Sequence, residues 1–276
     1  MSKLKIAIQK TGRLSEKSLN LLAECGIKLS NGDRKLIAEA SNFPIDVLFL
    51  RDDDIPQYVE EGVADIGIVG ENEVWEKKKN VSRVRKLGFA QCRLSLAIPK
   101  DEPYEGPQYF QNKKIATSYP HILKQYLNNL QIEAHIEEIG GSVEIAPGIG
   151  LSHGIFDIVG TGSTLLMNGL KEVCVVAQSE AVLISNSDLD KNKSTILDKL
   201  LFRIKAVKEA ACNKYILLNA PDSSLEKIIA LLPGMKSPTI LPLAMPGWSS
   251  VHTVVKEQED HVKVMDIAEM VAASLA

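Results

Sequence analysis

A short apolar run that leads at once into glycines and hydroxyls, at residues 154–166, constrains this chain most. Ile155 to Val159 is apolar and β-branched, which predicts a buried strand. The next five residues are Gly160-Thr161-Gly162-Ser163-Thr164. Leu165 and Leu166 can then open a helix. This succession predicts an α/β arrangement in which unpaired backbone N–H groups at a helix start face the turn.

The turn has the chemistry of a phosphate site. Glycines let the backbone approach a ligand closely, and three hydroxyls add donors at the positive end of a helix dipole. Asp157, just upstream, offers a carboxylate that can accept hydrogen bonds from ribose hydroxyls. The alternative is an ordinary tight turn that uses Gly, Ser and Thr for capping, and the segment alone does not separate the two.

Two sharper phosphate motifs do not match this turn. A Walker A loop needs a lysine, and none is present. A dinucleotide fingerprint needs a third glycine, but Leu165 stands at that position. The segment therefore predicts a phosphate and a sugar without specifying which.

A similar pattern lies 92 residues earlier (154 minus 62). Three pairs of positions share this offset: Gly62, Asp65 and Gly70 stand opposite Gly154, Asp157 and Gly162. Asp52 likewise stands opposite Glu144. The echo predicts two similar α/β lobes whose strand ends face one cleft, where open α/β sheets bind ligands. A chance match is the alternative.

Composition excludes several classes of function. The chain has 276 residues, a formal charge of −3 and 5% aromatic residues, which argues against a nucleic-acid-binding surface. Its four cysteines show no CxxC spacing, so we expect reduced thiols rather than a zinc site or disulfides. We find no signal-peptide core and no apolar run that could span a bilayer, so we expect a cytoplasmic protein.

Local patterns predict further elements. Ser15 is expected to cap a first helix, and another helix is expected over 146–153. Of the aspartates at 52–54, one is interpreted as a helix cap and the others as favourable charges at its positive end, with a metal site as the alternative. The basic stretch 76–86 is interpreted as a solvated loop, with an anion site as the alternative. From residue 214 the predicted order is strand, helix, strand, strand and helix. This order resembles a ferredoxin-like module without its last strand.

Several strings, in order along nearly the whole chain, resemble the long form of ATP phosphoribosyltransferase, the first enzyme of histidine biosynthesis. They are IQKTGRL (8–14), RDDDIP (51–56), DIGIVGEN (65–72), CRLSLA (92–97), ATSYPH (116–121), GSVEIAP (141–147), the segment 154–166 and PTILPL (238–243). The resemblance ends near residue 257. Relatives close the third domain with a final apolar strand, which we do not find here.

The resemblance implies an α/β fold: a two-lobed catalytic unit similar to type II periplasmic binding proteins, plus a C-terminal ferredoxin-like (ACT-like) domain. Lobe I would comprise residues 1–98 with 178–205, lobe II residues 99–177, and the regulatory domain residues 206–276. The implied reaction joins N1 of ATP to C1 of phosphoribosyl pyrophosphate (PRPP) and releases pyrophosphate. Mg²⁺ would be the cofactor, histidine the feedback inhibitor, and the assembly a homodimer or homohexamer.

The resemblance also implies roles for individual residues. PRPP would contact Asp157, Thr161, Gly162, Ser163 and Thr164. ATP would contact Gly12, Asp65, Gly70, Glu71, Arg93 and Tyr119. The catalytic residues would be Lys10, Arg13, Glu144 and Asp157, with surface charge as the alternative for the two cations. We assign no protein ligand to Mg²⁺, because this ion usually prefers phosphate oxygens and water.

Three other interpretations are weighed. A non-catalytic two-lobed binding protein shares the expected fold, but usually carries an export signal or a DNA-binding segment. Nucleobase phosphoribosyltransferases carry two adjacent acidic residues before the phosphate loop, whereas Phe156-Asp157 offers one. A purely regulatory subunit is disfavoured because both catalytic lobes look complete.

Overall fold

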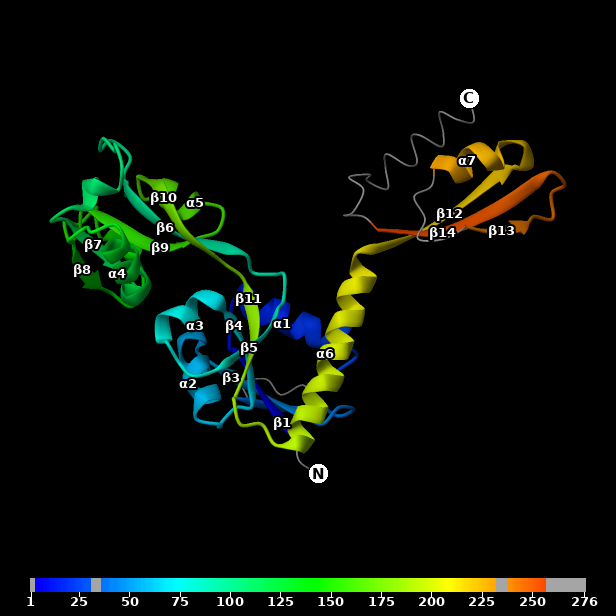
Figure 1. Cartoon of the computed structure of the whole chain (residues 1–276), viewed down its shortest axis with the longest axis horizontal. Coiled ribbons are helices and arrows are strands. Elements are labelled where there is room, and N and C mark those ends of the chain that lie inside the picture. The colour runs from blue at the N-terminus through cyan, green and yellow to red at the C-terminus, as the bar shows by residue number, and fades with distance from the viewer. Residues whose placement is uncertain (1–2, 31–35, 232–237, 257–276) are drawn as a thin grey trace. The chain divides into compact units, whose positions relative to one another are not determined.

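The computed structural model describes residues 3–30, 36–231 and 238–256 (Figure 1). The chain forms two compact units, residues 1–197 and 198–276. The first unit contains two sheets, and the second contains a smaller one. We describe each unit by itself.

The first sheet has six strands in the order β2-β3-β1-β4-β11-β5. Its centre is parallel, because β1 pairs with both β3 and β4 in the same direction. β11 then runs antiparallel to β4 and to β5. The strands are β1 (Leu4–Gln9), β2 (Ile37–Glu39), β3 (Ile45–Leu50), β4 (Ile66–Gly70), β5 (Ser82–Lys86) and β11 (Ala181–Ser185). The associated helices are α1 (Arg13–Glu24), α2 (Ile55–Glu60) and α3 (Glu71–Lys77).

The second sheet has five strands in the order β10-β6-β9-β7-β8. Again the centre is parallel, with β7 between β8 and β9, and β6 runs antiparallel to β9 and β10. The strands are β6 (Cys92–Pro99), β7 (Lys114–Thr117), β8 (His135–Glu138), β9 (Gly154–Val159) and β10 (Leu170–Ser179). The helices are α4 (Pro120–Asn129) and α5 (Ser163–Met167).

The two sheets repeat one topology. Five strands of the first, β3-β1-β4-β11-β5, match β8-β7-β9-β6-β10 of the second in order and direction. The predicted pair of similar α/β lobes is confirmed. The 92-residue offset aligns the helix starts, since Gly70 and Gly162 are the N-caps of α3 and α5. It does not align the strands, because β4 runs up to Gly70 whereas β9 ends at Val159.

The second unit is built on a three-stranded antiparallel sheet of order β12-β14-β13. Its elements are β12 (Asn213–Pro221), α7 (Leu225–Leu231), β13 (Thr239–Pro242) and β14 (Trp248–Lys256), preceded by α6 (Lys191–Ala211). This matches the predicted order of strand, helix, strand and strand. The helix expected over 258–275, and the expected absence of a last strand, lie outside the described residues.

Three local expectations are wrong. Helix α1 begins at Arg13 with Gly12 as its N-cap, and Ser15 is buried inside the helix. Over 146–153 the chain forms turns rather than a helix, following a 3-10 turn at Val143–Ile145. Pro147, Gly148 and Gly150 explain this, because proline and glycine are poor in helix interiors. The expected loop over 76–86 instead holds the end of α3 and the edge strand β5.

Among the helices that the structure describes, none combines the length and apolar character needed to cross a membrane.

Candidate active site

The glycine–hydroxyl turn lies where the sequence places it, between β9 and α5. Gly162 has φ 84°, a left-handed conformation that favours glycine, and caps α5. The Thr161 and Ser163 hydroxyl oxygens lie 3.0 Å apart. Residues 157–165 line a pocket of about 150 Å³, together with Arg13 and Glu144. Two segments distant in sequence are therefore brought to the turn.

Asp157 and Glu144 place two carboxylates at this pocket. Asp157 lies on β9, and its Oδ1 accepts a hydrogen bond from the backbone N–H of Ile158 at 2.8 Å. Burial raises the pKa of Asp157 to about 6, and the nearby charge of Glu144 adds to the effect. The sequence has no two adjacent acidic residues immediately before this turn. The fold instead brings Glu144, from the 3-10 turn, and Asp157, from β9, to the same pocket.

Two exposed cations flank the β1–α1 turn. Arg13 is the first residue of α1 and lines the pocket, while Lys10 follows β1 directly. Gly12, between them, has φ 96°. Within the described ranges, the side chains of Lys10 and Arg13 form no ion pair with a protein group. Both cations therefore remain available to an anionic ligand.

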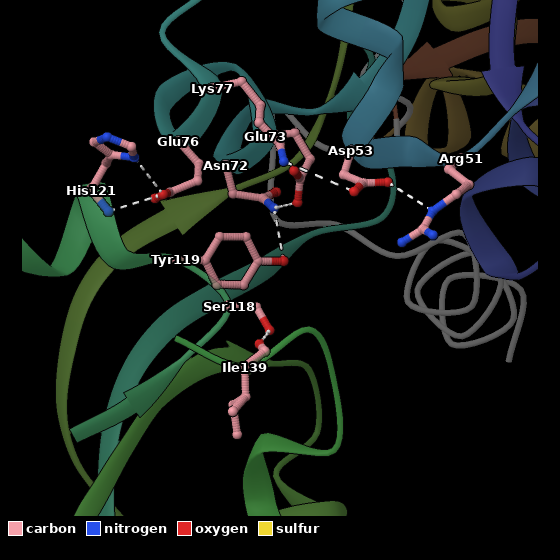
Figure 2. A network of polar contacts seen from close by, with 10 residues as sticks. All are labelled: Arg51, Asp53, Asn72, Glu73, Glu76, Lys77, Ser118, Tyr119, His121 and Ile139. Atoms are coloured by element: carbon pink, nitrogen blue, oxygen red, sulfur yellow. Dashed lines mark hydrogen bonds and ion pairs between the residues drawn. The ribbon is translucent and has the colours of Figure 1, made fainter. Parts of the chain in front are cut away.

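A second pocket, of about 250 Å³, contains Tyr119. It is lined by Arg51, Asp52, Asp53, Glu73, Lys77, Ser118, Tyr119, Glu138, Ile139 and Gly140. These residues end or follow β8, follow β3 and β7, or belong to α3, so both lobes contribute to its wall. Figure 2 shows Tyr119 facing Asn72 and Glu73 of α3, with Asn72 Nδ2 3.4 Å from the Tyr119 hydroxyl.

The electrostatics of this second pocket are unusual. Burial, together with the nearby charge of Asp52, raises the pKa of Glu73 to about 7. Burial also raises the pKa of Tyr119 well above its ordinary value, and the charge of Glu73 contributes. The phenol therefore stays neutral, and Glu73 titrates near neutral pH.

Two of the expected ATP ligands are engaged by protein groups. Glu71 is buried at the start of α3 and forms ion pairs with Lys86 at 3.0 Å and Arg83 at 3.3 Å. Arg93, on β6, pairs with Glu172 and donates through Nη1 to the carbonyl of Gly160 at 2.8 Å. Arg93 therefore lies against the phosphate turn rather than at the pocket that contains Tyr119.

Asp65 lies at the amino-terminal end of β4, and the junctions that lead from β1 to α1 and from β4 to α3 lie at the opposite, carboxyl ends of these strands. It precedes β4, whose five residues span roughly 16 Å, whereas Gly70 closes that strand at the α3 end. Its Oδ2 accepts from the backbone N–H of Lys5 and its Oδ1 from Lys193 Nζ, each at 2.7 Å. The structure does not bring Asp65 together with the other predicted site residues.

Sequence reasoning missed several residues of the second pocket. Glu73 carries no motif signal, because it sits in a polar helix of otherwise ordinary pattern. The sequence predicts that one of the aspartates at 52–54 caps a helix, but the short helices at 52–60 show no side-chain capping bond. Three adjacent acids directly after a strand were the available signal. Their place at a strand's carboxyl end favours ligand binding over capping.

Two α/β lobes of repeated topology, with a glycine–hydroxyl turn facing an arginine and two carboxylates, define a two-lobed protein suited to a phosphorylated sugar ligand. A family model described as "HisG: ATP phosphoribosyltransferase" matches residues 51–206, and "HisG, C-terminal domain" matches 210–274. The chain belongs to the ATP phosphoribosyltransferase family, in its long form, and is a transferase.

Individual relatives agree. The chain is 59% identical over 256 residues to the ATP phosphoribosyltransferase of Azobacteroides pseudotrichonymphae genomovar. CFP2, covering 93% of this chain and 90% of the relative. It is 57% identical over 256 residues to that of Cytophaga hutchinsonii, with the same coverage.

Solved structures agree on the fold. The ATP phosphoribosyl transferase (HisG:HisZ) complex from Thermotoga maritima contains a chain that is 30% identical, with a TM-score of 0.66. The match covers 75% of this chain and 98% of that one. Tv2483, solved bound to L-arginine, is 12% identical with a TM-score of 0.51, covering 76% and 86% of the two chains. The second likeness supports the two-lobed fold alone.

Proposed function

We propose that this chain transfers the phosphoribosyl group of PRPP to N1 of ATP, giving N1-(5-phosphoribosyl)-ATP and pyrophosphate, the first step of histidine biosynthesis. One observation carries the proposal most directly. The pocket at the glycine–hydroxyl turn gathers Arg13, Glu144 and Asp157 around a turn suited to a sugar phosphate. The relatives are named ATP phosphoribosyltransferase, and this name supports ATP as the acceptor of the phosphoribosyl group.

The proposed PRPP site follows from this pocket. The backbone N–H groups of the turn and the hydroxyls of Thr161, Ser163 and Thr164 bind the 5′-phosphate, with Gly162 allowing close approach. Asp157 and Glu144 accept hydrogen bonds from the ribose hydroxyls and stabilise positive charge developing at C1.

The proposed chemistry needs no activated nucleophile from the protein, because the attacking nitrogen and the leaving pyrophosphate both belong to substrates. The protein's task is to align them and to exclude water. Arg13 and Lys10 stabilise charge on the leaving pyrophosphate, since guanidinium binds phosphate oxygens in bidentate fashion.

We place ATP on the side that contains Tyr119. The second pocket offers an aromatic ring, a neutral phenol and the cations Arg51 and Lys77, which are paired with Asp53 at 3.2 and 3.9 Å respectively. Gly70 and Gly12 lie at the turns that follow β4 and β1, at the carboxyl ends of parallel strands, where α/β sheets bind ligands. We also propose contact of ATP with Glu71, Arg93 and Asp65. Each of these side chains already pairs with a protein group, so ATP would have to displace that group or share the side chain with it.

Mg²⁺ is the proposed cofactor. Among the described residues, no group of three or more acidic, histidine or cysteine side chains is arranged to hold a metal ion. Pyrophosphate oxygens and water would therefore supply most ligands, which suits the preferences of this ion. When bound, Mg²⁺ neutralises charge on the leaving pyrophosphate.

We propose the domain division expected from the sequence, residues 1–98 with 178–205, 99–177 and 206–276; the two compact units divide at 197/198, inside α6, eight residues before the proposed boundary. We further propose that the last of these binds histidine as a feedback inhibitor. We also propose that the enzyme assembles as a homodimer or homohexamer.

A pyrophosphate-release assay tests the proposal. We expect release only when ATP and PRPP are both present, and less release when L-histidine is added. Binding of PRPP by calorimetry without release on addition of ATP would instead support a non-catalytic two-lobed binding protein. Free adenine acting in place of ATP would support a nucleobase transferase.

A further inference from the structure

Helix α3 is shared by the two lobes. Val74 belongs to the buried core cluster of the first lobe, around Ile55 and Val59. Trp75, the next residue, packs against the core cluster of the second lobe, which contains Tyr119 and Leu123. Consecutive residues of one helix therefore anchor it in two separate cores.

Glu76 adds a polar connection at the same place. Its buried carboxylate accepts hydrogen bonds from the backbone N–H groups of His121 at 2.9 Å and Ile122 at 3.0 Å. The Nδ1 of His121 lies 2.9 Å from the same carboxylate (Figure 2). A carboxylate that accepts two N–H groups at the positive end of a helix stabilises that end.

This capping is supplied from outside the helix. His121 and Ile122 lie in the first turn of α4, and the helix's own N-cap residue, Tyr119, makes no side-chain capping bond. The first lobe therefore caps a helix of the second lobe. Because Tyr119 immediately precedes that helix, whatever fixes the start of α4 also fixes Tyr119.

We propose that Glu76 is a positioning residue for the nucleotide half of the reaction. By holding the start of α4 against α3, it sets the separation between Tyr119 and Glu73, which line the same pocket from different lobes. Loss of the Glu76 contacts leaves the apolar packing of Trp75, the contact of Glu73 with Tyr119 and the long 3.4 Å contact between Asn72 and the Tyr119 hydroxyl, none of which holds the backbone at the start of α4. The inference rests on the proposed placement of ATP at this pocket.

Kinetics of Glu76→Gln and Glu76→Ala test the proposal. We expect the KM for ATP to rise about tenfold in Glu76→Ala and less in Glu76→Gln, which keeps one acceptor oxygen, while the KM for PRPP stays within about twofold. Glu60→Gln is the matched control. Glu60 also accepts a backbone N–H bond, from Asn80 at 2.7 Å, but within the first lobe.

A lowered melting temperature with both KM values unchanged would make Glu76 a structural cap and overturn the proposal. Equal rises in both KM values would overturn it too. Should Glu76→Ala fail to fold, Glu76→Gln decides alone.

Two further measurements do not need turnover. Calorimetry gives the Kd of ATP for Glu76→Gln and for the unaltered chain, with the same weakening expected. The chain has two tryptophans, so Trp248→Phe leaves Trp75 as the sole tryptophan, which can be excited selectively over the tyrosines. Glu76→Gln in that background should shift Trp75 emission to the red.

The outcomes separate the two proposals. An unaltered chain that binds ATP but releases no pyrophosphate removes the proposed function, and the Kd values still test Glu76. Weakened ATP binding with unshifted Trp75 emission overturns the inference, because the effect would not pass through the junction.

Discussion

Arg93 on β6 and Glu172 on β10 form a bidentate ion pair, with Nε–Oε1 at 2.5 Å and Nη2–Oε2 at 2.6 Å. The Ser95 hydroxyl donates to the same carboxylate at 2.7 Å. The remaining guanidinium nitrogen of Arg93 holds the carbonyl of Gly160, the first residue of the phosphate turn. The ion pair therefore braces the turn from within the second lobe.

Arg93→Lys should weaken PRPP binding more than ATP binding. Lysine keeps the charge but cannot form the two-pronged pair and the Gly160 contact together. We expect the KM for PRPP to rise about five- to tenfold, and the KM for ATP to change less than twofold. Steady-state kinetics check this, with Glu137→Gln as the control, since Glu137 pairs with Lys114 on the same sheet. A larger rise for ATP would support the direct ATP contact that the sequence suggested.

Leucine at Thr161 or Thr164 should raise the KM for PRPP far more than that for ATP. The larger side chain removes a hydroxyl donor and fills part of a pocket of about 150 Å³. Thr195→Leu, at an exposed position of α6, controls for the substitution itself. If both substrates suffered equally, the phosphate site would lie elsewhere.

Binding of PRPP should weaken in acid because of Asp157. Its pKa of about 6 means that the carboxylate is protonated below pH 6 and can no longer accept two hydroxyl bonds as an anion. We expect the KM for PRPP to rise by up to about tenfold per pH unit below 6, and this rise to vanish in Asp157→Asn. The measurement is the KM for PRPP across pH, for the unaltered chain and for Asp157→Asn.

The same shift has a consequence for stability. A carboxyl whose pKa is raised by folding favours the folded state below its unfolded value near 4, and this contribution is lost as pH rises through about 6. Asp157→Asn should therefore stabilise the chain at pH 8 by about 1–2 kcal/mol and change little at pH 4. Melting temperatures at the two pH values test the sign.

Gly70→Ala should destabilise the first lobe. A Cβ at this position would collide with the side chain of Asn72, whose Oδ1 accepts from Ser179 at 2.8 Å. We expect a loss of about 1–3 kcal/mol in the free energy of unfolding. Gly140→Ala is the control, because its Cβ would meet no atom within 4 Å. Equal effects at the two glycines would contradict the packing argument.

A chain ending at Ala211, where α6 ends, should keep part of its activity and lose inhibition by L-histidine. Its two-lobed unit retains every residue placed at the two pockets. Pyrophosphate release across a histidine titration gives the answer. Undiminished inhibition in the shortened chain would refute the assignment of regulation to the C-terminal domain.

The strands and the phosphate turn could be predicted because local signals determine them. Apolar β-branched runs predict β4 and β9. The glycines after β9 predict the turn, and Gly162 indeed has a positive φ there. The helix expected over 146–153 failed because its apolar spacing was outweighed by one proline and two glycines.

Two features of the site could not be predicted from the sequence, because they depend on strand register and on contacts between distant segments. Asp65 and Asp157 match in sequence, but β4 begins one residue after Asp65 whereas β9 begins three residues before Asp157. The carboxylate of Asp65 therefore lies at the amino-terminal end of β4, whereas that of Asp157 lines the pocket at the glycine–hydroxyl turn. No pattern in the sequence gives that difference in register, nor the contact of Glu76 with a helix 45 residues away.

The strand order has a consequence for synthesis on the ribosome. β11 occupies an interior place in the first sheet, between β4 and β5, yet it is translated after the whole second sheet. Until residue 185 has emerged, β4 has an open edge and β5 has no neighbour to pair with. The nascent amino-terminal lobe therefore stays incomplete while the intervening lobe is made, with the edge of β4 open to pairing with other chains.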